Sequence, residues 1–150
     1  MRIVLQRVRN AQVIIENEES KEIGQGILVL LGIEMADEMS DVDWLVNKVL
    51  NLRIFDDDNG LMNKSLLDVN GELMIVSQFT LMAATKKGNR PSYIKAASHE
   101  HAIPLYESFI KKTESLLESK IATGTFAAMM RVVLENDGPV TILIDSKNKE

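Results

Sequence analysis

The chain has 150 residues, of which 45% are hydrophobic and 26% are charged, which is the length and composition of one globular domain with a hydrophobic core. It contains no cysteine, which excludes disulfide bonds, a cysteine nucleophile and a thiolate metal site. The formal net charge of −5 argues against a general nucleic-acid-binding protein, because such proteins carry an overall or strongly localised positive charge.

The chain has no segment that resembles a membrane span or a signal peptide. Its longest apolar run, Ile27 to Ile33, is far shorter than the roughly 20 residues that cross a bilayer. Residues 1–7 lack a continuous apolar stretch followed by a small-residue cleavage site. We therefore expect a cytoplasmic protein that forms a single domain over residues 1–150.

The beginning of the chain has apolar patterns typical of strands. Residues 2–8 and 11–16 are rich in Val and Ile with partial alternation, which predicts antiparallel strands, and turn-forming residues follow at 17–20. Residues 26–33 are apolar at nearly every position. This pattern predicts a central strand that is covered on both faces.

A helix is predicted over residues 40–52. Its apolar residues recur at spacings of three and four: Val42, Leu45, Val46, Val49 and Leu50. We expect Ser40 to cap this helix, with Asp41 and Asp43 near its positive end.

A short strand at 53–55 is expected to lead into an acidic turn at 56–60. The turn resembles a calcium-binding loop only superficially, because Gly60 occupies the fifth loop position where an EF-hand requires glycine at the sixth. The Asn70-Gly71 pair then opens a strand predicted over 72–81.

The last part of the chain predicts a second helix and two strands. The helix covers 99–118, so Pro104 must lie in its first turns or kink it. The strands cover 127–135 and 140–145 and are joined through 136–139. The expected fold class is α/β, with mixed, largely antiparallel sheets and the two main helices packed on one side.

The histidines flank Glu100 at the start of the second predicted helix. His99 and His101 are two residues apart and point in different directions, whereas the zinc-protease pattern needs a spacing of four, so we expect no metal. Either histidine can in principle activate Ser77 or Thr80, although the surroundings of a nucleophile elbow are missing. We interpret both histidines as surface residues at a helix start.

Three segments carry polar groups for which two interpretations stay open. The segment 77–81 either exposes functional groups at a strand end or satisfies nearby backbone. The segment 88–92 is either a fixed turn that presents a cation to an anion or an ordinary loop. The segment 136–141 is either a hairpin turn or, since a Gly-Pro pair can be cis, a unit that points its carbonyls outward.

The densest basic cluster is Lys86, Lys87 and Arg90, with Lys95 nearby. Because the chain as a whole is acidic, any RNA contact must be local, and these residues are the candidates for tRNA phosphate contacts. Ordinary solvated charges are the alternative.

The motifs of this chain, in their order and separations, resemble those of the D-aminoacyl-tRNA deacylase family, formerly named for D-tyrosyl-tRNA. The resemblance covers essentially the whole chain and rests on the three segments above and on Leu5-Gln6-Arg7-Val8, Arg53-Ile54-Phe55 and Met62-Asn63. Two departures are Ala84, where many members have aspartate, and Tyr93, where phenylalanine is commoner.

The resemblance implies an α/β homodimer that hydrolyses the ester between a D-amino acid and the 3′-terminal adenosine of tRNA; whether mis-attached glycine is also removed stays open. This is a proofreading step in translation. It implies active sites at the subunit interface, no metal or organic cofactor, and neither DNA nor a membrane as partner.

The resemblance also implies site residues. Those within one subunit are Ser77, Gln78, Phe79 and Thr80 as catalytic residues, with Phe126 and Met130 near the aminoacyl-adenosine. Gly138 and Pro139 are expected from the other subunit as a Gly-cis-Pro motif that rejects L-amino acids. Attack by water is favoured over an acyl-Thr80 intermediate, because no activating base is evident beside that hydroxyl.

Two other classes of function compete with a hydrolase. A non-catalytic RNA-binding module would use the basic cluster, but the chain is acidic and only 5% aromatic, which leaves few rings for stacking bases. A purely structural dimer would explain the apolar strands but not the polar strand end.

Overall fold

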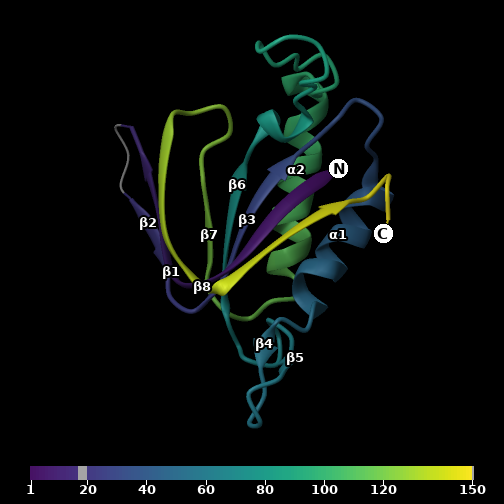
Figure 1. Cartoon of the computed structure of the whole chain (residues 1–150). Helices are drawn as coiled ribbons and strands as arrows, with labels where there is room; N and C mark the ends of the chain where they lie inside the picture. Colours follow the sequence, from purple (N-terminus) through teal and green to yellow (C-terminus); the bar gives the residue numbers. More distant parts are fainter. Residues whose placement is uncertain (17–19, 150) are drawn as a thin grey trace.

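A mixed sheet of six strands organises the part of the chain that the computed structural model describes, residues 1–16 and 20–149 (Figure 1). The hydrogen-bonded order is β2-β1-β3-β6-β7, and β8 also pairs with β1. The strands are β1 Arg2–Ile15, β2 Lys21–Ile23, β3 Gly26–Gly32, β6 Glu72–Ser77, β7 Ile121–Thr123 and β8 Met130–Asp145. Of the turn predicted at 17–20, residues 17–19 lie outside the described residues.

Strand directions make the sheet mixed, as predicted. Strand β1 is antiparallel to β2, β3 and β8, whereas β3, β6 and β7 run parallel to one another. The parallel strands bring their carboxyl ends to the same edge of the sheet. Strand β3 lies between β1 and β6, so the predicted central strand is confirmed.

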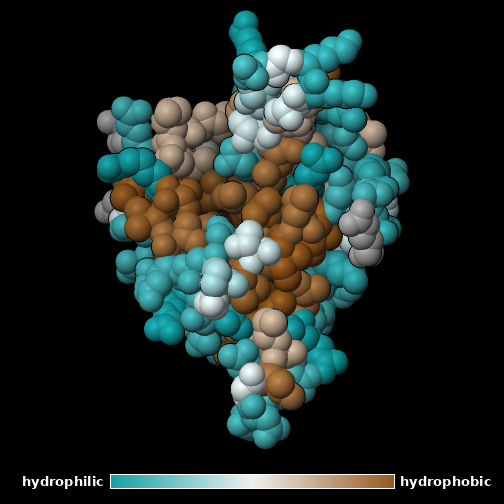
Figure 2. All heavy atoms as spheres, in the orientation of Figure 1, coloured by the Kyte–Doolittle hydropathy of each residue, from teal (hydrophilic) through white to brown (hydrophobic). Residues whose placement is uncertain are grey.

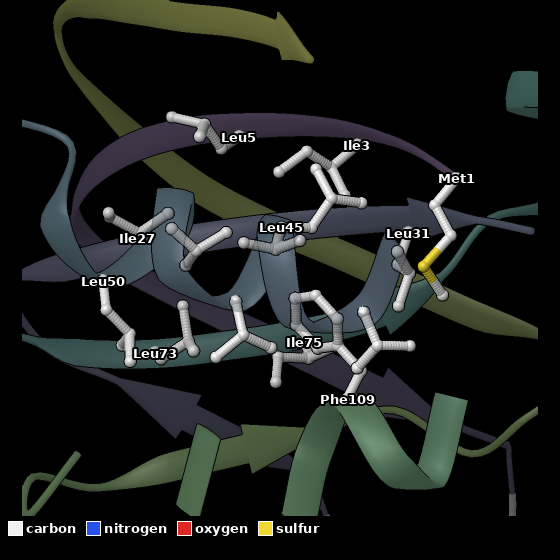
Figure 3. Close-up of a cluster of buried hydrophobic side chains, with 14 of the residues drawn as sticks. Met1, Ile3, Leu5, Ile27, Leu31, Leu45, Leu50, Leu73, Ile75 and Phe109 are labelled. Carbon is white, nitrogen blue, oxygen red and sulfur yellow. The ribbon is translucent and has the colours of Figure 1, made fainter. Parts of the chain in front are cut away.

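Both helices, α1 Met39–Asn51 and α2 His99–Glu114, pack on the same face of the sheet, as predicted. Alternate residues of the central strands meet the apolar sides of the helices in one core (Figure 3). Fully buried members of this core include Ile27, Val29, Leu45, Val49, Leu73, Ile75 and Phe109. No helix in the described part of the chain is long and apolar enough to span a membrane.

A second core lies on the opposite face of the sheet. It contains Leu28 and Met74 together with Val13 and Ile15 from the C-terminal half of β1. Residues in the N-terminal half of β1, such as Ile3, belong to the first core instead. The two strands predicted at 2–8 and 11–16 are therefore one strand, whose pairing with β8 is irregular between Gln6 and Asn10.

The two strands predicted at 127–135 and 140–145 are likewise one strand, β8. Asn136 pairs with Val8 and Thr141 pairs with Gln6, so both halves of β8 continue along β1 in the same direction. The hairpin-turn interpretation of 136–141 is wrong, because a hairpin would reverse the chain. Residues 137–140 instead form a bulge, in which the peptide bond between Gly138 and Pro139 is cis, as the alternative interpretation expected.

Several predicted boundaries shift. Strand β6 ends at Ser77 and a 3-10 helix, η1 Phe79–Met82, follows it, so the strand predicted over 72–81 is too long. Helix α2 ends at Glu114 rather than 118, and it contains Pro104 near its start. The strand predicted at 53–55 is β4 Phe55–Asp56, paired with β5 Met62–Lys64.

The acidic segment between β4 and β5 is an ordinary turn, as predicted. The Asp57 carboxylate accepts hydrogen bonds from the backbone N–H groups of Asn59 and Leu61 at 2.9 and 3.1 Å. These bonds and the bond from the Asn63 amide lower the pKa of Asp57. The Asp57 carboxylate thus accepts its hydrogen bonds from groups of the same turn.

Helix α1 is capped by Glu38, not by Ser40. The Glu38 backbone N–H donates to the Asp41 carboxylate at 2.9 Å, and the Ser40 hydroxyl donates to the Glu38 side chain at 2.8 Å. Asp41, at the third helical position, therefore forms the cap with Glu38, and the predicted cap at Ser40 is wrong.

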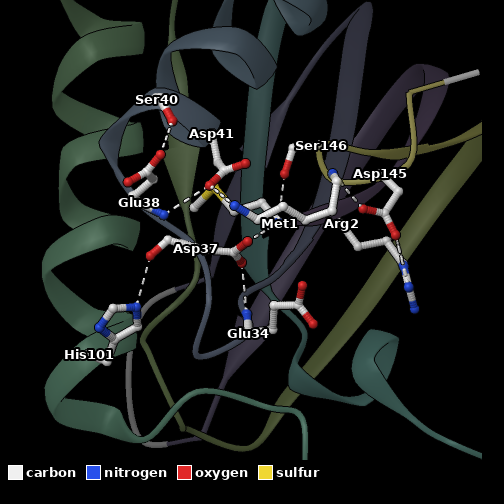
Figure 4. A network of polar contacts seen from close by, with 11 residues as sticks. Met1, Arg2, Glu34, Asp37, Glu38, Ser40, Asp41, His101, Asp145 and Ser146 are labelled. Atoms are coloured by element: carbon white, nitrogen blue, oxygen red, sulfur yellow. Dashed lines mark hydrogen bonds and ion pairs between the residues drawn. The ribbon is translucent and has the colours of Figure 1, made fainter.

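A polar network ties the start of β1 and the end of β8 to the start of α1 (Figure 4). The Met1 ammonium contacts the buried Asp37 carboxylate and lies 2.7 Å from Ser146 Oγ. His101 Nε2 lies 3.0 Å from the Asp37 carbonyl oxygen. This network links the start of β1 and the end of β8 to the segment before α1, and it occupies one ring nitrogen of His101.

Candidate functional site

A cavity of about 420 Å³ opens at the carboxyl ends of β3 and β6. In open sheets with parallel strands, ligands commonly bind outside the carboxyl ends of those strands. The cavity is lined by residues from the strand ends, the start of α2 and the segment before and into β8: Leu31, Ile33, Val76, Ser77, Gln78, Phe79, Ala96, Ala97, His99, Ala102, Phe126, Ala127, Ala128, Met129, Met130 and Val132.

The structure brings most of the predicted site residues together at this cavity. Ser77, Gln78 and Phe79 line it from the end of β6, and Phe126 and Met130 line it from the segment before and into β8. Thr80 is not among the lining residues, but its hydroxyl accepts a hydrogen bond from the Gln78 amide. Residues far apart in the sequence therefore converge here.

The end of β6 is polar because the chain leaves the sheet there. The Gln78 N–H donates to the Leu31 carbonyl at 2.8 Å, which is the last bond toward β3. The 3-10 helix η1 then begins, and its closing bonds run from Leu81 N–H to the Gln78 carbonyl and from Ala83 N–H to the Thr80 carbonyl, at 3.2 and 3.1 Å. The first N–H groups of a helix have no acceptor within it, so the N–H groups of Phe79 and Thr80 are not bonded inside η1, and Phe79 lines the cavity.

Phe126 is held by the side chains of α2. Its ring lies 5.5 Å from the ring of His99, edge to face, and 5.6 Å from the ring of Tyr106. The Tyr106 hydroxyl in turn donates to the Ile75 carbonyl at 3.1 Å. Burial raises the pKa of Tyr106, so the hydroxyl keeps its proton and this aromatic wall is fixed in place.

His99 is a cavity residue that the sequence analysis interpreted only as a surface group. It does lie exposed at the helix start, as expected, but it also lines the cavity. Its neighbour in space, Phe126, is distant in the sequence, and no local pattern of residues indicates that contact.

Gly124 is a second residue that sequence patterns missed. Its N–H donates to the Ile75 carbonyl at 3.0 Å, and a side-chain carbon at this position would come within 2.5 Å of the Met130 sulfur. A side chain at residue 124 would therefore displace the Met130 thioether from its present position in the cavity lining.

Gly138 and Pro139 do not line the cavity of their own chain. Both are exposed in the bulge of β8, and Gly138 has a φ of 124°, which favours glycine. The bulge is held from below by Arg7, which is 7% exposed. Arg7 donates to the Asp137 carbonyl at 3.1 Å and to the Ile54 carbonyl at 2.6 Å.

Lys86, Lys87 and Arg90 lie in the segment between η1 and α2, which projects beyond the sheet in Figure 1. The segment is closed by two hydrogen bonds between the backbones of Ala84 and Ser92, at 2.8 and 3.0 Å. All three cations are exposed and none lines the cavity. Ala96 and Ala97, which come later in the same segment, do line the cavity.

Among residues 1–16 and 20–149, no three His, Asp or Glu side chains gather closely enough to hold a metal ion. The cavity lining contains no carboxylate. Its polar groups are the main chain and small polar side chains at the end of β6, together with His99.

Fold and site together define a single α/β domain with a largely apolar pocket whose mouth carries main-chain donors. The chain matches the model of the D-Tyr-tRNA(Tyr) deacylase family over residues 4–145, and it belongs to that family. This confirms the resemblance found in the sequence.

The relatives agree with this assignment, and solved structures share the fold. The chain is 59% identical to the D-aminoacyl-tRNA deacylase of Bacteroides thetaiotaomicron across 100% of both chains, and 61% identical to that of Cytophaga hutchinsonii across 98% of both. A solved structure of a c-Myc DNA unwinding element binding protein has a TM-score of 0.91 and 41% identity, covering 97% of this chain and 98% of that one. A probable eukaryotic D-amino acid tRNA deacylase shares the fold, with a TM-score of 0.80 at 18% identity and coverage of 95% and 97%.

Proposed function

We propose that this protein is a D-aminoacyl-tRNA deacylase, acting in the cytoplasm as a single domain over residues 1–150. It hydrolyses the ester between a D-amino acid and the 3′-terminal adenosine of tRNA. The observation that carries the proposal is the convergence of Ser77, Gln78 and Phe79 on a pocket, in a chain 59% identical over its whole length to a relative with that name.

The pocket suits one aminoacyl-adenosine. A cavity of about 420 Å³ is within the range of about 300 to 1,000 Å³ that binds small ligands. Phe126 and Met130 supply apolar walls. The ester would then lie at the end of β6.

The chemistry we propose is direct attack by water. Water adds to the ester carbonyl carbon, the bond to the ribose oxygen breaks, and the products are a free amino acid and a tRNA with its terminal hydroxyl restored. In this proposal the N–H groups of Phe79 and Thr80 would stabilise the negative oxygen of the transition state. The neighbouring hydroxyl of the terminal ribose assists.

A conventional catalytic dyad has less support. In the described part of the chain, no hydrogen bond joins His99 to Ser77 or to Thr80. The group bonded to the Thr80 hydroxyl is the Gln78 amide, which is not a base. A site built from main chain therefore fits these residues better than an acyl-enzyme route.

Selection of D-amino acids is proposed to need a homodimer. The bulge of β8 that carries Gly138 and Pro139 is exposed and lies outside its own chain's cavity, so it is available to a second subunit. In the partner's pocket, the carbonyls of this Gly-cis-Pro motif would hold the substrate's amino group. An L-side chain would then meet rigid backbone, whereas a D-side chain would point outward and glycine would pass.

The decisive experiment incubates the protein with matched D- and L-aminoacyl-tRNA and follows release of the amino acid. We expect release from the D-substrate, none from the L-substrate, and release from glycyl-tRNA. Equal release from D- and L-substrates would contradict the chirality proposal, and no release from any of them would contradict the deacylase proposal.

A second candidate is nucleic-acid binding without hydrolysis. It is favoured by the 41% identity to a c-Myc DNA unwinding element binding protein, and by the local basic cluster. In the same assay a pure binder would retain tRNA, or single-stranded DNA, without releasing amino acid.

A further inference from the structure

An exposed aromatic pair stands at the mouth of the cavity. Phe79, which lines the cavity, is 58% exposed, and Tyr93 is 37% exposed. Their rings lie 5.0 Å apart with an interplanar angle of 67°. The next residue, Ile94, is 87% exposed, so the apolar surface continues outward from the cavity. Apolar groups gathered in this way indicate a contact surface rather than part of the core.

Backbone contacts hold Tyr93 in place. Beside it, the Ser92 N–H donates to the Ala84 carbonyl at 3.0 Å, and the Ala96 N–H donates to the Tyr93 carbonyl at 2.9 Å. The Ala97 N–H then donates to the Ile33 carbonyl at 2.9 Å, which attaches the segment to the end of β3. The ring is therefore presented by a closed turn and not by a free chain.

The charge around this pair is positive. From Leu73 to His99 the sequence has no Asp or Glu, although the whole chain has 22. The cations of this stretch lie on both sides of Tyr93 in the sequence, three before it and one after it: Lys86, Lys87, Arg90 and Lys95. Aromatic rings beside a basic groove are the combination with which proteins bind single-stranded nucleic acid.

We propose that Phe79, Tyr93 and Ile94 form a stacking platform for the unpaired nucleotides that precede the terminal adenosine of tRNA. The proposal rests on the proposed function, which places that adenosine in the cavity. The strand must then leave through the mouth, where the platform lies, and its phosphates pass the four cations. Stacking needs only the face of a base, so the platform binds the single-stranded end without reading the rest of the tRNA.

The test compares two substrates that differ only in the nucleotides before the adenosine. One is D-aminoacyl-tRNA and the other is the D-aminoacyl ester of adenosine alone. We expect Tyr93→Ala to lower kcat/KM about tenfold on the tRNA, through KM, and to leave the adenosine ester unchanged. Tyr93→Phe keeps the ring and should behave as the parent.

A matched control removes an exposed apolar side chain elsewhere. Leu61 is 65% exposed and lies beside β5, at the end of the molecule opposite the projecting segment (Figure 1). Leu61→Ala should leave both substrates unchanged. Thermal unfolding of each variant checks that the fold is intact.

Each other outcome overturns the platform. An equal loss on both substrates would make Tyr93 a support of the cavity only, and no loss on either would mean that no base stacks there. If the parent hydrolyses neither substrate, the deacylase proposal fails by itself. Binding of an uncharged RNA hairpin with a CCA end, compared with the same hairpin without it, then tests the platform: Tyr93→Ala must weaken binding of the first only. Equal weakening of both, or of neither, would contradict it.

Discussion

At the scale of single residues, Gln78 and Thr80 define what the cavity mouth can do. The Gln78 amide donates to Thr80 Oγ1, so the hydroxyl must direct its own proton elsewhere. An amide cannot remove that proton, and an unactivated hydroxyl is a poor nucleophile at neutral pH. This geometry suits a hydroxyl that positions a water molecule or a substrate oxygen.

Thr80→Ala should therefore retain measurable turnover. Removing one neutral hydrogen bond costs about 0.5 to 1.5 kcal/mol, which corresponds to a rate reduction of about tenfold at most. Single-turnover release of a D-amino acid from tRNA measures this. Complete inactivity of the variant, with an acyl group trapped on Thr80 in the parent, would contradict attack by water.

Asp41 is the residue whose charge is most clearly coupled to stability. Burial alone would raise its pKa, but hydrogen bonds from Lys147, Ser146 and the Glu38 backbone outweigh burial and lower the pKa to about 2. Because the pKa is lower in the folded state, the ionised carboxylate stabilises the fold above about pH 4. That stabilisation disappears as the pH falls from about 4 toward 2.

Asp41→Asn should lower the free energy of unfolding at pH 7 by about 2 kcal/mol, with a smaller difference from the parent at pH 3. Urea unfolding at both pH values measures the two differences. Asp43→Asn is the matched control in the same helix: Asp43 is 52% exposed and pairs with Lys112 at the surface, so its replacement should change little. Equal effects of the two substitutions would refute the role given to Asp41.

At the scale of elements, sequence patterns predicted the strands and helices whose formation depends on neighbouring residues. Strand β3 and helix α1 were predicted nearly at their true bounds, because continuous apolarity and a helical period are properties of neighbouring residues. The continuity of β8 was missed, since it depends on pairing with β1 across more than a hundred residues. β7 was not predicted, because it has only the three residues Ile121–Thr123.

The site was predictable to the same extent. The polar end of β6 shows in the sequence as Ser77 and Gln78 after an apolar run, and family resemblance supplied Phe126 and Met130. The contact of His99 with Phe126 and the space that Gly124 leaves for Met130 are visible only in three dimensions. No residue pattern within a single element indicates either of them.

The basic segment between η1 and α2 is the element expected to give tRNA binding its salt dependence. Replacing Lys86, Lys87 and Arg90 by alanine should weaken binding of tRNA and reduce the slope of log K against log salt by about one for each phosphate that these side chains neutralise in the parent. Filter binding or fluorescence anisotropy at several salt concentrations measures the slope.

The matched control removes three cations that lie elsewhere. Lys48, Lys64 and Lys111 belong to α1, β5 and α2. Replacing them by alanine changes the net charge by the same amount and should leave the slope close to that of the parent. If the two triple variants behave alike, the effect comes from net charge and not from the segment.

At the scale of the whole molecule, a broad apolar surface lies over the strands. Figure 2 shows apolar residues gathered at the centre and left of the view, over the sheet. Around β8, Met129 is 77% exposed, Val133 is 54% exposed and Leu143 is 62% exposed. Side chains of β8 that point the other way, such as Ile142, pack against the core. A patch of this kind marks an interaction surface, and a second copy of the chain is the occupant that the proposed function requires.

The last prediction is that two copies meet over this surface and exchange their bulges. Leu143→Asp should convert a dimer into a monomer, because it would bury a charge in an apolar contact, and activity should disappear with the dimer. Sedimentation equilibrium measures whether the variant is a dimer or a monomer. Leu61→Asp places the same charge on an exposed apolar residue away from β8 and should leave the protein dimeric and active.

Mixing two inactive variants tests whether the bulge acts on the partner. Gly138→Val disrupts the bulge, since its φ of 124° disfavours a side chain and the new carbon would lie 2.9 Å from Val140, while Ala128→Trp fills the cavity. In a mixed dimer, the open cavity of the first variant receives the intact bulge of the second. Unfolding and reassembling an equal mixture should therefore restore about a quarter of the parent's sites, because about half of the dimers are mixed and each has one complete site. If the bulge serves its own chain's cavity, every site lacks one component and the mixture stays inactive.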